Sequence, residues 1–310
     1  MRLGVLDVGS NTVHLLVVDA HQGGHPDPVR SHKGGLRLSE LLRPDGSLGA
    51  QGTDALVAAV TGARKAAQEE GVDDLVAFAT SAVRDATDSA EVLAAVRDRA
   101  GVDLLVLPGA DEARLTFLAV RRWFGWSAGR LLCLDIGGGS LELAAGLDEE
   151  PEVALSLPLG AGRLTRERLT GNPPAAKAVT AVRAYAREQL DSVSAKLLAG
   201  GHVDRGVATS KTFRSLARLD GAAAYAQGPR VPRMLRRSGL ERITRQLAPL
   251  TAAQRAELPG VSPSRAHQLL AGAIVAQAAL DALGLDEVSV CPWALREGVI
   301  LRRLDWLANS

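Results

Sequence analysis

Residues 2–11 read RLGVLDVGSN, and residues 131–140 read LLCLDIGGGS. Each stretch is an apolar run that reaches an aspartate and then enters a turn containing glycine. A short apolar run bounded by turn residues is typical of a buried strand, and glycine permits a tight turn or the close approach of a ligand. Both stretches therefore predict a central strand that ends on a carboxylate.

The two stretches are copies of an internal repeat with an offset of 128 residues. Each copy predicts the same order of features: buried strand, aspartate, glycine-containing turn and second strand. Two unrelated β-hairpins are the simpler alternative, but an aspartate at the end of a central strand in both copies favours a duplicated functional unit. The identical pairs are Leu3/Leu131, Leu6/Leu134, Asp7/Asp135, Gly9/Gly137 and Leu15/Leu143.

Strand and helix patterns alternate along the chain, which is typical of an α/β protein. The predicted strands cover residues 2–8, 13–19, 74–79, 103–107, 130–136, 141–146, 152–157, 204–208 and 286–291. The predicted helices cover residues 51–70, 88–100, 111–123, 175–198, 211–219, 237–247, 264–283 and 294–307.

A break between two domains is expected within residues 121–130, where two glycines end one helix pattern before a new apolar run begins. The expected domains are residues 1–124 and residues 125–310. Residues 221–235 interrupt the pattern again with Gly and Pro, and we expect them to form a loop inside the second domain.

The composition limits the classes of function. The chain has 310 residues, is 46% hydrophobic and has a formal net charge of +1, which is typical of a globular protein long enough for two cores. Nucleic-acid binding is not expected, because domains with that function usually carry a basic excess. No apolar run approaches the length of a membrane span, and the apolar N-terminus reaches Asp7 too early for a signal peptide. We therefore expect a cytoplasmic protein without membrane contact.

The glycine-containing turns have a chemical use. Such a turn can present successive N–H groups into one concavity, which can bind a phosphate. A carboxylate beside the turn would repel the phosphate unless a cation lies between the two. Mg²⁺ is suited to this position because it binds through few carboxylates together with phosphate oxygens and water. Each copy of the repeat therefore predicts phosphate binding, with Mg²⁺ as the cofactor.

Five ordered motifs resemble known families. DVGSNT at 7–12 and DIGGGS at 135–140 resemble the two phosphate motifs of the actin, Hsp70 and sugar-kinase superfamily. ATSAVRDA at 79–86, DEARLTFLAV at 111–120 and ALREGVIL at 294–301 resemble the exopolyphosphatase and guanosine pentaphosphate phosphohydrolase (Ppx/GppA) family, in particular its short two-domain exopolyphosphatases.

The resemblance implies two actin-like (ribonuclease H-like) domains, each a mixed sheet flanked by helices, with an active-site cleft between the domains. It also implies Mg²⁺-dependent hydrolysis of the terminal phosphoanhydride bond of inorganic polyphosphate, and a homodimer. Guanosine tetraphosphate or pentaphosphate is the alternative partner, and a pppGpp 5′-phosphohydrolase is the alternative function. A small-molecule kinase and a noncatalytic polyphosphate- or nucleotide-binding regulator are less favoured, because an adenine-contacting glycine turn is not found and Glu112 is present.

The family pattern assigns the catalytic and metal-binding roles. Glu112 matches the catalytic glutamate, which orients and deprotonates water; as an acid at a helix start, it could instead only cap the helix. Asp135 would hold Mg²⁺, and Asp7 would bind it directly or through water. Glu142 matches the pattern that follows the glycines and is a metal or water ligand of second rank.

The same pattern assigns the phosphate contacts. A guanidinium can bind phosphate oxygens bidentately, which suits Arg84 to this role, although it could instead pair with Asp85 or Asp88 at the surface. Lys211 stands where the kinases and chaperones have a glycine against the adenine, so it favours polyphosphate over a nucleotide. The expected contacts are Ser10, Asn11, Thr12, Arg84, Gly137, Gly138, Gly139, Ser140 and Lys211.

Basic residues are concentrated between residues 205 and 245. This segment holds ten Lys or Arg residues against two acids, in a chain that is close to neutral overall. Such a concentration predicts a track for the rest of a polyanion. A set of solvated helix faces is the alternative, because no single residue of the segment is diagnostic.

Overall fold

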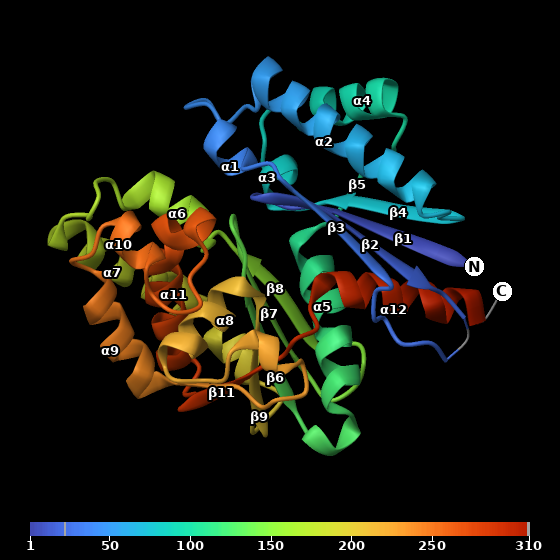
Figure 1. Ribbon diagram of the computed structural model, residues 1–310. Coiled ribbons are helices and arrows are strands. Elements are labelled where there is room, and N and C mark those ends of the chain that lie inside the picture. Colours follow the sequence, from blue (N-terminus) through green and yellow to red (C-terminus); the bar gives the residue numbers. More distant parts are fainter. Residues whose placement is uncertain (22, 309–310) are drawn as a thin grey trace. The chain divides into compact units, whose positions relative to one another are not determined.

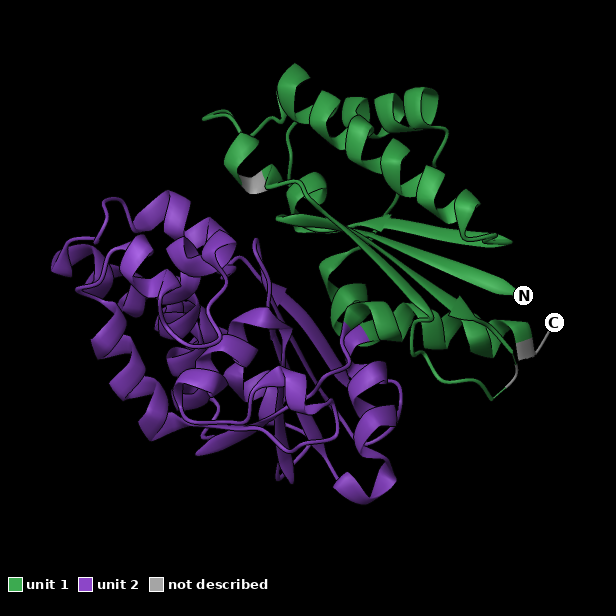
Figure 2. Ribbon diagram, viewed as in Figure 1, with its two compact units in different colours: residues 1–115, 295–310 green, residues 116–294 purple. Residues whose placement is uncertain are grey.

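The computed structural model describes residues 1–21 and 23–308, which fold as two compact units (Figures 1 and 2). Unit 1 comprises residues 1–115 and 295–310, and unit 2 comprises residues 116–294. The sequence-based boundary at residue 124 differs from this division in two respects. The division falls inside helix α5 (Gly109–Phe124), and the C-terminal helix α12 (Leu295–Ala308) returns to unit 1.

Unit 1 is built on a mixed sheet. Within the described residues its strand order is β3-β2-β1-β4-β5, with β1 antiparallel to β2 and parallel to β4. The strands are β1 (Arg2–Val8), β2 (Thr12–Asp19), β3 (Arg30–Gly35), β4 (Asp74–Ala79) and β5 (Leu105–Val106). The remaining helices of the unit are α1 (Leu38–Leu41), α2 (Gly49–Glu69), α3 (Ser81–Arg84) and α4 (Ser89–Ala100).

Helices cover both faces of this sheet (Figure 1). Leu6 and Val8 pack in one cluster with apolar residues of α2 and α4. Because successive side chains of a strand point to opposite faces, Leu3 and Val5 face the other way, where Ile300 of α12 is fully buried against them. The apolar face of α12 therefore explains why the end of the chain belongs to unit 1.

Unit 2 is also a mixed sheet with helices. Within the described residues its strand order is β10-β11-β9-β6-β7-β8. The strands are β6 (Leu131–Ile136), β7 (Leu141–Gly146), β8 (Val153–Leu157), β9 (Arg205–Thr209), β10 (Met234–Arg236) and β11 (Glu287–Val290). The α-helices are α6 (Ala161–Arg168), α7 (Ala176–Leu198), α8 (Ser210–Leu219), α9 (Arg237–Leu247), α10 (Ala252–Ala256) and α11 (Leu269–Ala282). The 3₁₀ turns are η1 (Trp126–Ala128), η2 (Tyr225–Gln227) and η3 (Pro263–Gln268).

Helix α11 lies at the centre of the unit 2 core. Eleven of its 14 residues are buried, among them Ile274 and Leu280, and α7 and α9 contribute to the same apolar cluster. A helix that is apolar on every side is stable in water only when other elements surround it. The sheet and the neighbouring helices meet this requirement.

The internal repeat is confirmed by the strand pairing. Asp7 is paired with His14 across β1 and β2, and Asp135 is paired with Glu142 across β6 and β7. Both partners are displaced by 128 residues, as are the other pairs that the two hairpins share. The two copies therefore have the same register, and each places its aspartate at the same position relative to its turn.

The predicted α/β class is confirmed, and the predicted elements agree with the structure to within two residues at nearly every end. Three differences have clear causes. Strand β3 was not predicted because its sequence, RSHKGG, is almost wholly exposed and has no apolar alternation. The expected loop at 221–235 contains η2 and continues into the short edge strand β10, which pairs antiparallel with β11. The helix expected at 264–283 begins as the 3₁₀ turn η3.

Across residues 1–21 and 23–308, no helix combines the length and the apolar character that a membrane span requires.

Packing of α12 against the unit 1 sheet can be tested with two matched truncations. Leu304 of α12 is 7% exposed, whereas Leu105 of β5 is 60% exposed. We expect Leu304→Ala to lower the free energy of unfolding by about 2–4 kcal/mol, because it leaves a cavity in a buried cluster. Leu105→Ala should change it by less than about 1 kcal/mol. Urea denaturation followed by circular dichroism measures both, and equal effects would contradict this account of α12.

Candidate active site

The unit 1 hairpin carries four of the predicted residues. The N–H of Gly9 donates to the carbonyl of Thr12 over 3.0 Å and closes the turn after β1. Ser10 and Asn11 lie within this turn and are buried, and the hydroxyl of Ser10 lies 3.3 Å from that of Ser81. In the described part of the chain, the side-chain oxygen of Asn11 is buried without a hydrogen-bond partner. The turn thus holds polar groups out of bulk water, where a ligand could pair with them.

Asp7 lies at the end of β1 on the face that α12 covers. Arg296, at the start of α12, has its Nε 3.9 Å from a carboxylate oxygen of Asp7. Both side chains are about one-fifth exposed, so their attraction is only partly screened by water. Arg296 belongs to the motif at 294–301, although no role for it was predicted from the sequence.

Glu112 and Arg84 are brought together by the fold of unit 1. Glu112 lies in the first turn of α5 and is 5% exposed, and its carboxylate accepts a hydrogen bond from Nη1 of Arg84. The same nitrogen of Arg84 donates to the carbonyl of Leu107 over 3.1 Å, and Nε donates to Asp85 over 3.1 Å. The surface pairing of Arg84 with Asp85 therefore occurs, but together with a buried pair.

The electrostatic environment keeps Arg84 charged. Burial by itself lowers the pKa of Arg84, but attraction by Glu112 and then by Asp85 outweighs burial, so the net pKa is raised. Glu112 therefore faces a permanent cation. A carboxylate held in one position by a hydrogen bond can serve as a general base once a water lies within its reach.

The glycine turn of unit 2 is hydrogen-bonded to helix α6. The N–H of Gly137 donates to the carbonyl of Ser140 over 2.9 Å, as its counterpart does in unit 1. The carbonyls of Gly137 and Gly138 accept from the N–H groups of Ala161 and Arg163 at 3.0 and 2.9 Å. The carbonyl of Gly139, the next residue, accepts from the Arg163 side chain at 2.9 Å. All three glycine carbonyls are thus directed at α6.

This arrangement determines where the N–H groups of the turn point. In a planar trans peptide, the carbonyl and the following N–H point in opposite directions. The N–H groups of Gly138, Gly139 and Ser140 therefore point away from α6 and toward one side of the turn. Successive N–H groups arranged in this way form an anion-binding concavity.

Two carboxylates lie beside this concavity. Asp135 and Glu142 are direct partners across β6 and β7, so both side chains project from the same face of the sheet. Asp135 accepts a hydrogen bond from the hydroxyl of Thr209 at 2.6 Å, and Glu142 accepts one from Ser156 at 2.9 Å. Like charges directly opposite each other destabilise a sheet, and a bound cation would relieve this repulsion.

The predicted metal ligands can be compared with this geometry. Asp7 lies in unit 1, and Asp135 and Glu142 lie in unit 2. Among residues 1–21 and 23–308, no group of three or more His, Cys, Asp or Glu side chains is arranged to hold a metal ion. The paired oxygen donors of Asp135 and Glu142 nevertheless fit a hard cation that takes few protein ligands and completes its shell with water and phosphate.

Comparison with known proteins shows which family the chain resembles. Residues 17–307 match the Ppx/GppA phosphatase family. The chain belongs to this family. A protein named Exopolyphosphatase 1 from Mycobacterium tuberculosis is 58% identical over 310 residues, which is 100% of this chain and 90% of that protein.

Two solved structures resemble the fold. An exopolyphosphatase from Cytophaga hutchinsonii has a TM-score of 0.88 at 24% identity and covers 99% of this chain and 98% of its own. A Ppx/GppA family member from Aquifex aeolicus has a TM-score of 0.83 at 24% identity, over 100% of this chain and 99% of its own. These similarities support the expected fold class over the whole chain.

Lys211 of this Ppx/GppA protein lies at the junction of β9 and α8. It follows Ser210, whose φ of 79° is a left-handed conformation that residues other than glycine rarely adopt. Thr209, which begins the helix as its N-cap, is the residue that bonds to Asp135. The junction therefore joins the predicted phosphate contact Lys211 to the predicted metal ligand Asp135 through two residues.

Thr209 and Arg296 are the polar partners of the two repeat aspartates that sequence reasoning missed. A signal for Thr209 exists in the sequence, because ATS occurs both at 79–81, where β4 ends, and at 208–210, where β9 ends. Thr80 and Thr209 are the N-caps of the helices that follow, with similar extended backbone angles. The repeat therefore extends beyond the hairpins, although no local pattern indicates that Thr209 reaches an aspartate.

Many arginines of the basic segment at 205–245 pair with acids or donate hydrogen bonds to backbone carbonyls. Arg233 is 7% exposed and donates to the carbonyls of Ala223, Ala224, Gly228 and Val231, so it stabilises its own loop. Other members of the segment pair with acids: Arg236 and Arg242 with Asp220, Arg237 with Asp286, and Arg245 with Glu241. A polyanion track formed by the entire segment is therefore less favoured than the sequence suggested.

The attachment of the glycine turn to α6 can be tested at Gly160. A Cβ there would lie 2.2–2.5 Å from backbone atoms of Gly138, Gly139 and Ser140, so the turn would have to move. We expect Gly160→Ala to lower the free energy of unfolding by about 1–3 kcal/mol, as overpacking does. Gly62→Ala is the matched control, because a Cβ there meets nothing within 4 Å in the exposed face of α2.

The control should increase the free energy of unfolding by about 0.5–1 kcal/mol, because alanine is favoured over glycine in a helix. Thermal unfolding of the two variants measures both changes. A Gly160→Ala variant as stable as the wild type would mean that α6 does not hold the turn closely.

Proposed function

We propose that this protein is an exopolyphosphatase that releases orthophosphate from the end of inorganic polyphosphate. Membership of the Ppx/GppA phosphatase family and 58% identity with Exopolyphosphatase 1 support the reaction class. The observation that carries the proposal is the buried carboxylate of Glu112 bonded to Arg84, because it joins a base and a phosphate-binding cation in one place. A general base within reach of a phosphate-binding group is what the attack of water on phosphorus requires.

Glu112 acts as the base in the proposed reaction. It accepts a proton from the attacking water while the water oxygen forms a bond to the terminal phosphorus. The bond from that phosphorus to its bridging oxygen breaks, which releases orthophosphate and leaves a chain shorter by one phosphate. Arg84, whose pKa is raised, remains cationic and offsets the negative charge of the phosphoryl group.

The two turns and Lys211 bind the phosphates of the substrate. In unit 2 the N–H groups of Gly138, Gly139 and Ser140 follow Gly137 and serve as donors. In unit 1 the donors are Ser10, Asn11 and the hydroxyl of Thr12. Lys211 adds a point charge for a phosphate of the chain, which supports polyphosphate over a guanosine nucleotide, since a long cation would crowd a base.

Mg²⁺ is the proposed cofactor. Asp135 and Glu142 would hold the ion in unit 2, and Asp7 stays a predicted ligand, directly or through water. The bound ion would supply neutralisation of the phosphate charge that develops during hydrolysis. Thr209 holds the Asp135 carboxylate in one orientation through its hydrogen bond at 2.6 Å. A homodimer, a cytoplasmic location and the use of pppGpp as an alternative substrate remain predictions.

The role of Glu112 is tested by Glu112→Gln. We expect release of phosphate from polyphosphate to fall by at least about 100-fold, because the amide keeps the shape of the side chain but cannot accept the proton. Binding of polyphosphate should persist. Asp111→Asn is the matched control, because Asp111 is the neighbouring acid in the same helical turn but is about half exposed and pairs with Arg114.

The control variant should retain most of the activity. If Glu112→Gln kept more than about a tenth of the wild-type rate, Glu112 would be a helix-capping residue and not the base. Free phosphate measured over time with purified wild type and both variants gives this comparison.

The metal assignment is tested by Asp135→Asn. We expect activity to require a divalent cation, and the variant to need a concentration of Mg²⁺ about tenfold higher or more, because a carboxylate ligand is lost. Asp191→Asn, a change at the exposed face of α7, is the control for charge alone. Full turnover in excess EDTA, or the same Mg²⁺ dependence in both variants, would contradict the assignment.

A further inference from the structure

A cavity in unit 2 lies away from the residues assigned above. Its volume is about 170 Å³, and helices α6, α10 and α11 contribute residues to its wall. At about 30 Å³ for each water in the liquid, it has room for a molecule of roughly five or six non-hydrogen atoms. No residue of the proposed hydrolysis lines this cavity.

Arg255 is the charged group of the cavity and is 2% exposed. Its Nε donates to the carbonyl of Leu247 over 3.1 Å, which fixes the guanidinium. Its Nη2 is buried and has no hydrogen-bond partner in the described part of the chain. Burial lowers the pKa of Arg255, which reflects the cost of removing its charge from water.

A buried cation without a carboxylate beside it needs an explanation. Leaving a buried donor unsatisfied costs free energy, and the cost is larger for a charged group. The other buried arginines of unit 2 have hydrogen-bond acceptors for both terminal nitrogens: Arg121 donates to three carbonyls, Arg130 to Glu152, and Arg233 to four carbonyls. In the described part of the chain, the Nε atoms of Arg121 and Arg130 lack a partner, but Arg255 differs in that a terminal nitrogen does. The residues that line the cavity include neither Asp nor Glu. An anionic ligand would supply the missing partner.

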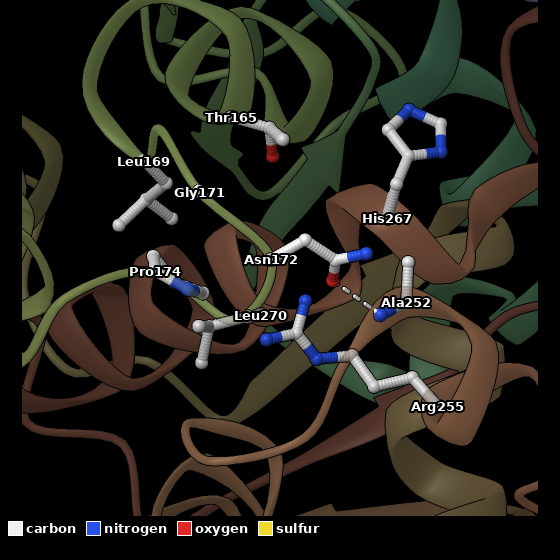
Figure 3. A pocket seen from close by; sticks show the side chains of 9 residues that line it. All are labelled: Thr165, Leu169, Gly171, Asn172, Pro174, Ala252, Arg255, His267 and Leu270. Atoms are coloured by element: carbon white, nitrogen blue, oxygen red, sulfur yellow. Dashed lines mark hydrogen bonds between the residues drawn. The ribbon is translucent and has the colours of Figure 1, made fainter.

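The walls indicate which kind of anion fits. Figure 3 shows the Arg255 guanidinium pointing in among the lining side chains, and the ring of His267 turned away from it. Leu169, Leu270 and Pro174 give the cavity apolar walls. One guanidinium offsets one negative charge, so a doubly charged phosphate would leave a charge uncompensated beside these walls. A monocarboxylate with a short aliphatic body satisfies both the cation and the walls.

We propose that this cavity is a binding site for a small aliphatic monocarboxylate, whose carboxylate pairs with the guanidinium of Arg255. Asn172 helps to shape the site, since its side-chain oxygen accepts the N–H of Ala252 at 2.6 Å and leaves its amide NH₂ as a further donor (Figure 3). The proposal concerns a ligand site in unit 2 and does not depend on the hydrolysis proposed above.

Helix α6 links the proposed ligand site to the glycine turn. Thr165 of α6 lines the cavity, and the first turn of the same helix bonds to Gly137 and Gly138. A ligand at Arg255 therefore contacts the helix that holds the turn. Binding is best measured directly, so that its success or failure is distinguishable from that of the proposed hydrolysis.

The experiment uses the full chain and butyrate, which has six non-hydrogen atoms. Isothermal titration calorimetry should show one butyrate bound per chain. Butyramide, the neutral analogue, should bind at least about tenfold more weakly, because it cannot form the charge-assisted hydrogen bond. Orthophosphate should also bind at least about tenfold more weakly, because it lacks the aliphatic body that contacts the apolar walls. Arg255→Met should weaken butyrate binding by a similar factor, whereas Arg245→Met, at an exposed arginine of α9, should leave it unchanged.

A second variant keeps the result decisive if Arg255→Met does not fold. Ala252→Leu retains the guanidinium but fills the cavity, so it should abolish butyrate binding. Equal binding of butyrate and butyramide would overturn the proposal, as would tighter binding of orthophosphate. Unchanged binding in Ala252→Leu, or no binding of butyrate to the wild type, would overturn it too, and the Nη2 group would then be satisfied by water alone.

Discussion

The strand register of the two hairpins is the constraint on which the rest of this structure depends. Side chains alternate between the faces of a strand, so a slip of one residue in β1 or β6 would turn Asp7 or Asp135 into the apolar cluster that holds Leu6 or Leu134. The observed register keeps Leu6 and Leu134 in the two cores and presents Asp7 and Asp135 on the other faces. It also sets the turn, because the closing hydrogen bond from Gly9 or Gly137 forms only in this register. The carboxylates and the glycine-containing turns are therefore positioned by the same pairing that forms the cores.

The buried arginines of this protein differ in what balances their charge. A buried charge is stable only when it is paired or hydrogen-bonded. Arg130 and Arg233 meet this condition with a carboxylate and with backbone carbonyls, and so hold the chain together. Arg84 meets it with Glu112, which joins the proposed phosphate-binding cation to the proposed base. In the described part of the chain, the terminal nitrogen Nη2 of Arg255 has no such partner, and this is the basis of the proposed ligand site.

Much of the fold follows from local pattern, and the exceptions have physical causes. Apolar runs such as Leu131–Ile136 predict buried strands because they are shorter than a typical helix and are bounded by turn residues. Strand β3 has no such pattern, since it is an exposed edge strand held by backbone hydrogen bonds to β2. Helix α6 was missed because AGRLTRER is short and polar, and its position depends on the glycine turn that it contacts. The membership of α12 in unit 1 depends on burial against a sheet whose strands all lie within residues 2–106, far from α12 in the sequence.

The sequence by itself determined the α/β class, the repeat with its two aspartates, the glycine-containing turns and the family resemblance, because each of these is encoded in consecutive residues. Only the tertiary structure decided which groups meet across the chain: Arg84 with Glu112, Thr209 with Asp135, and Arg296 with Asp7. It also decided that Arg233 supports a loop and that Arg255 lies beside a cavity. The physical reason is that a side chain's partners and its exposure to water are set by the packing of distant elements, which a linear pattern does not specify.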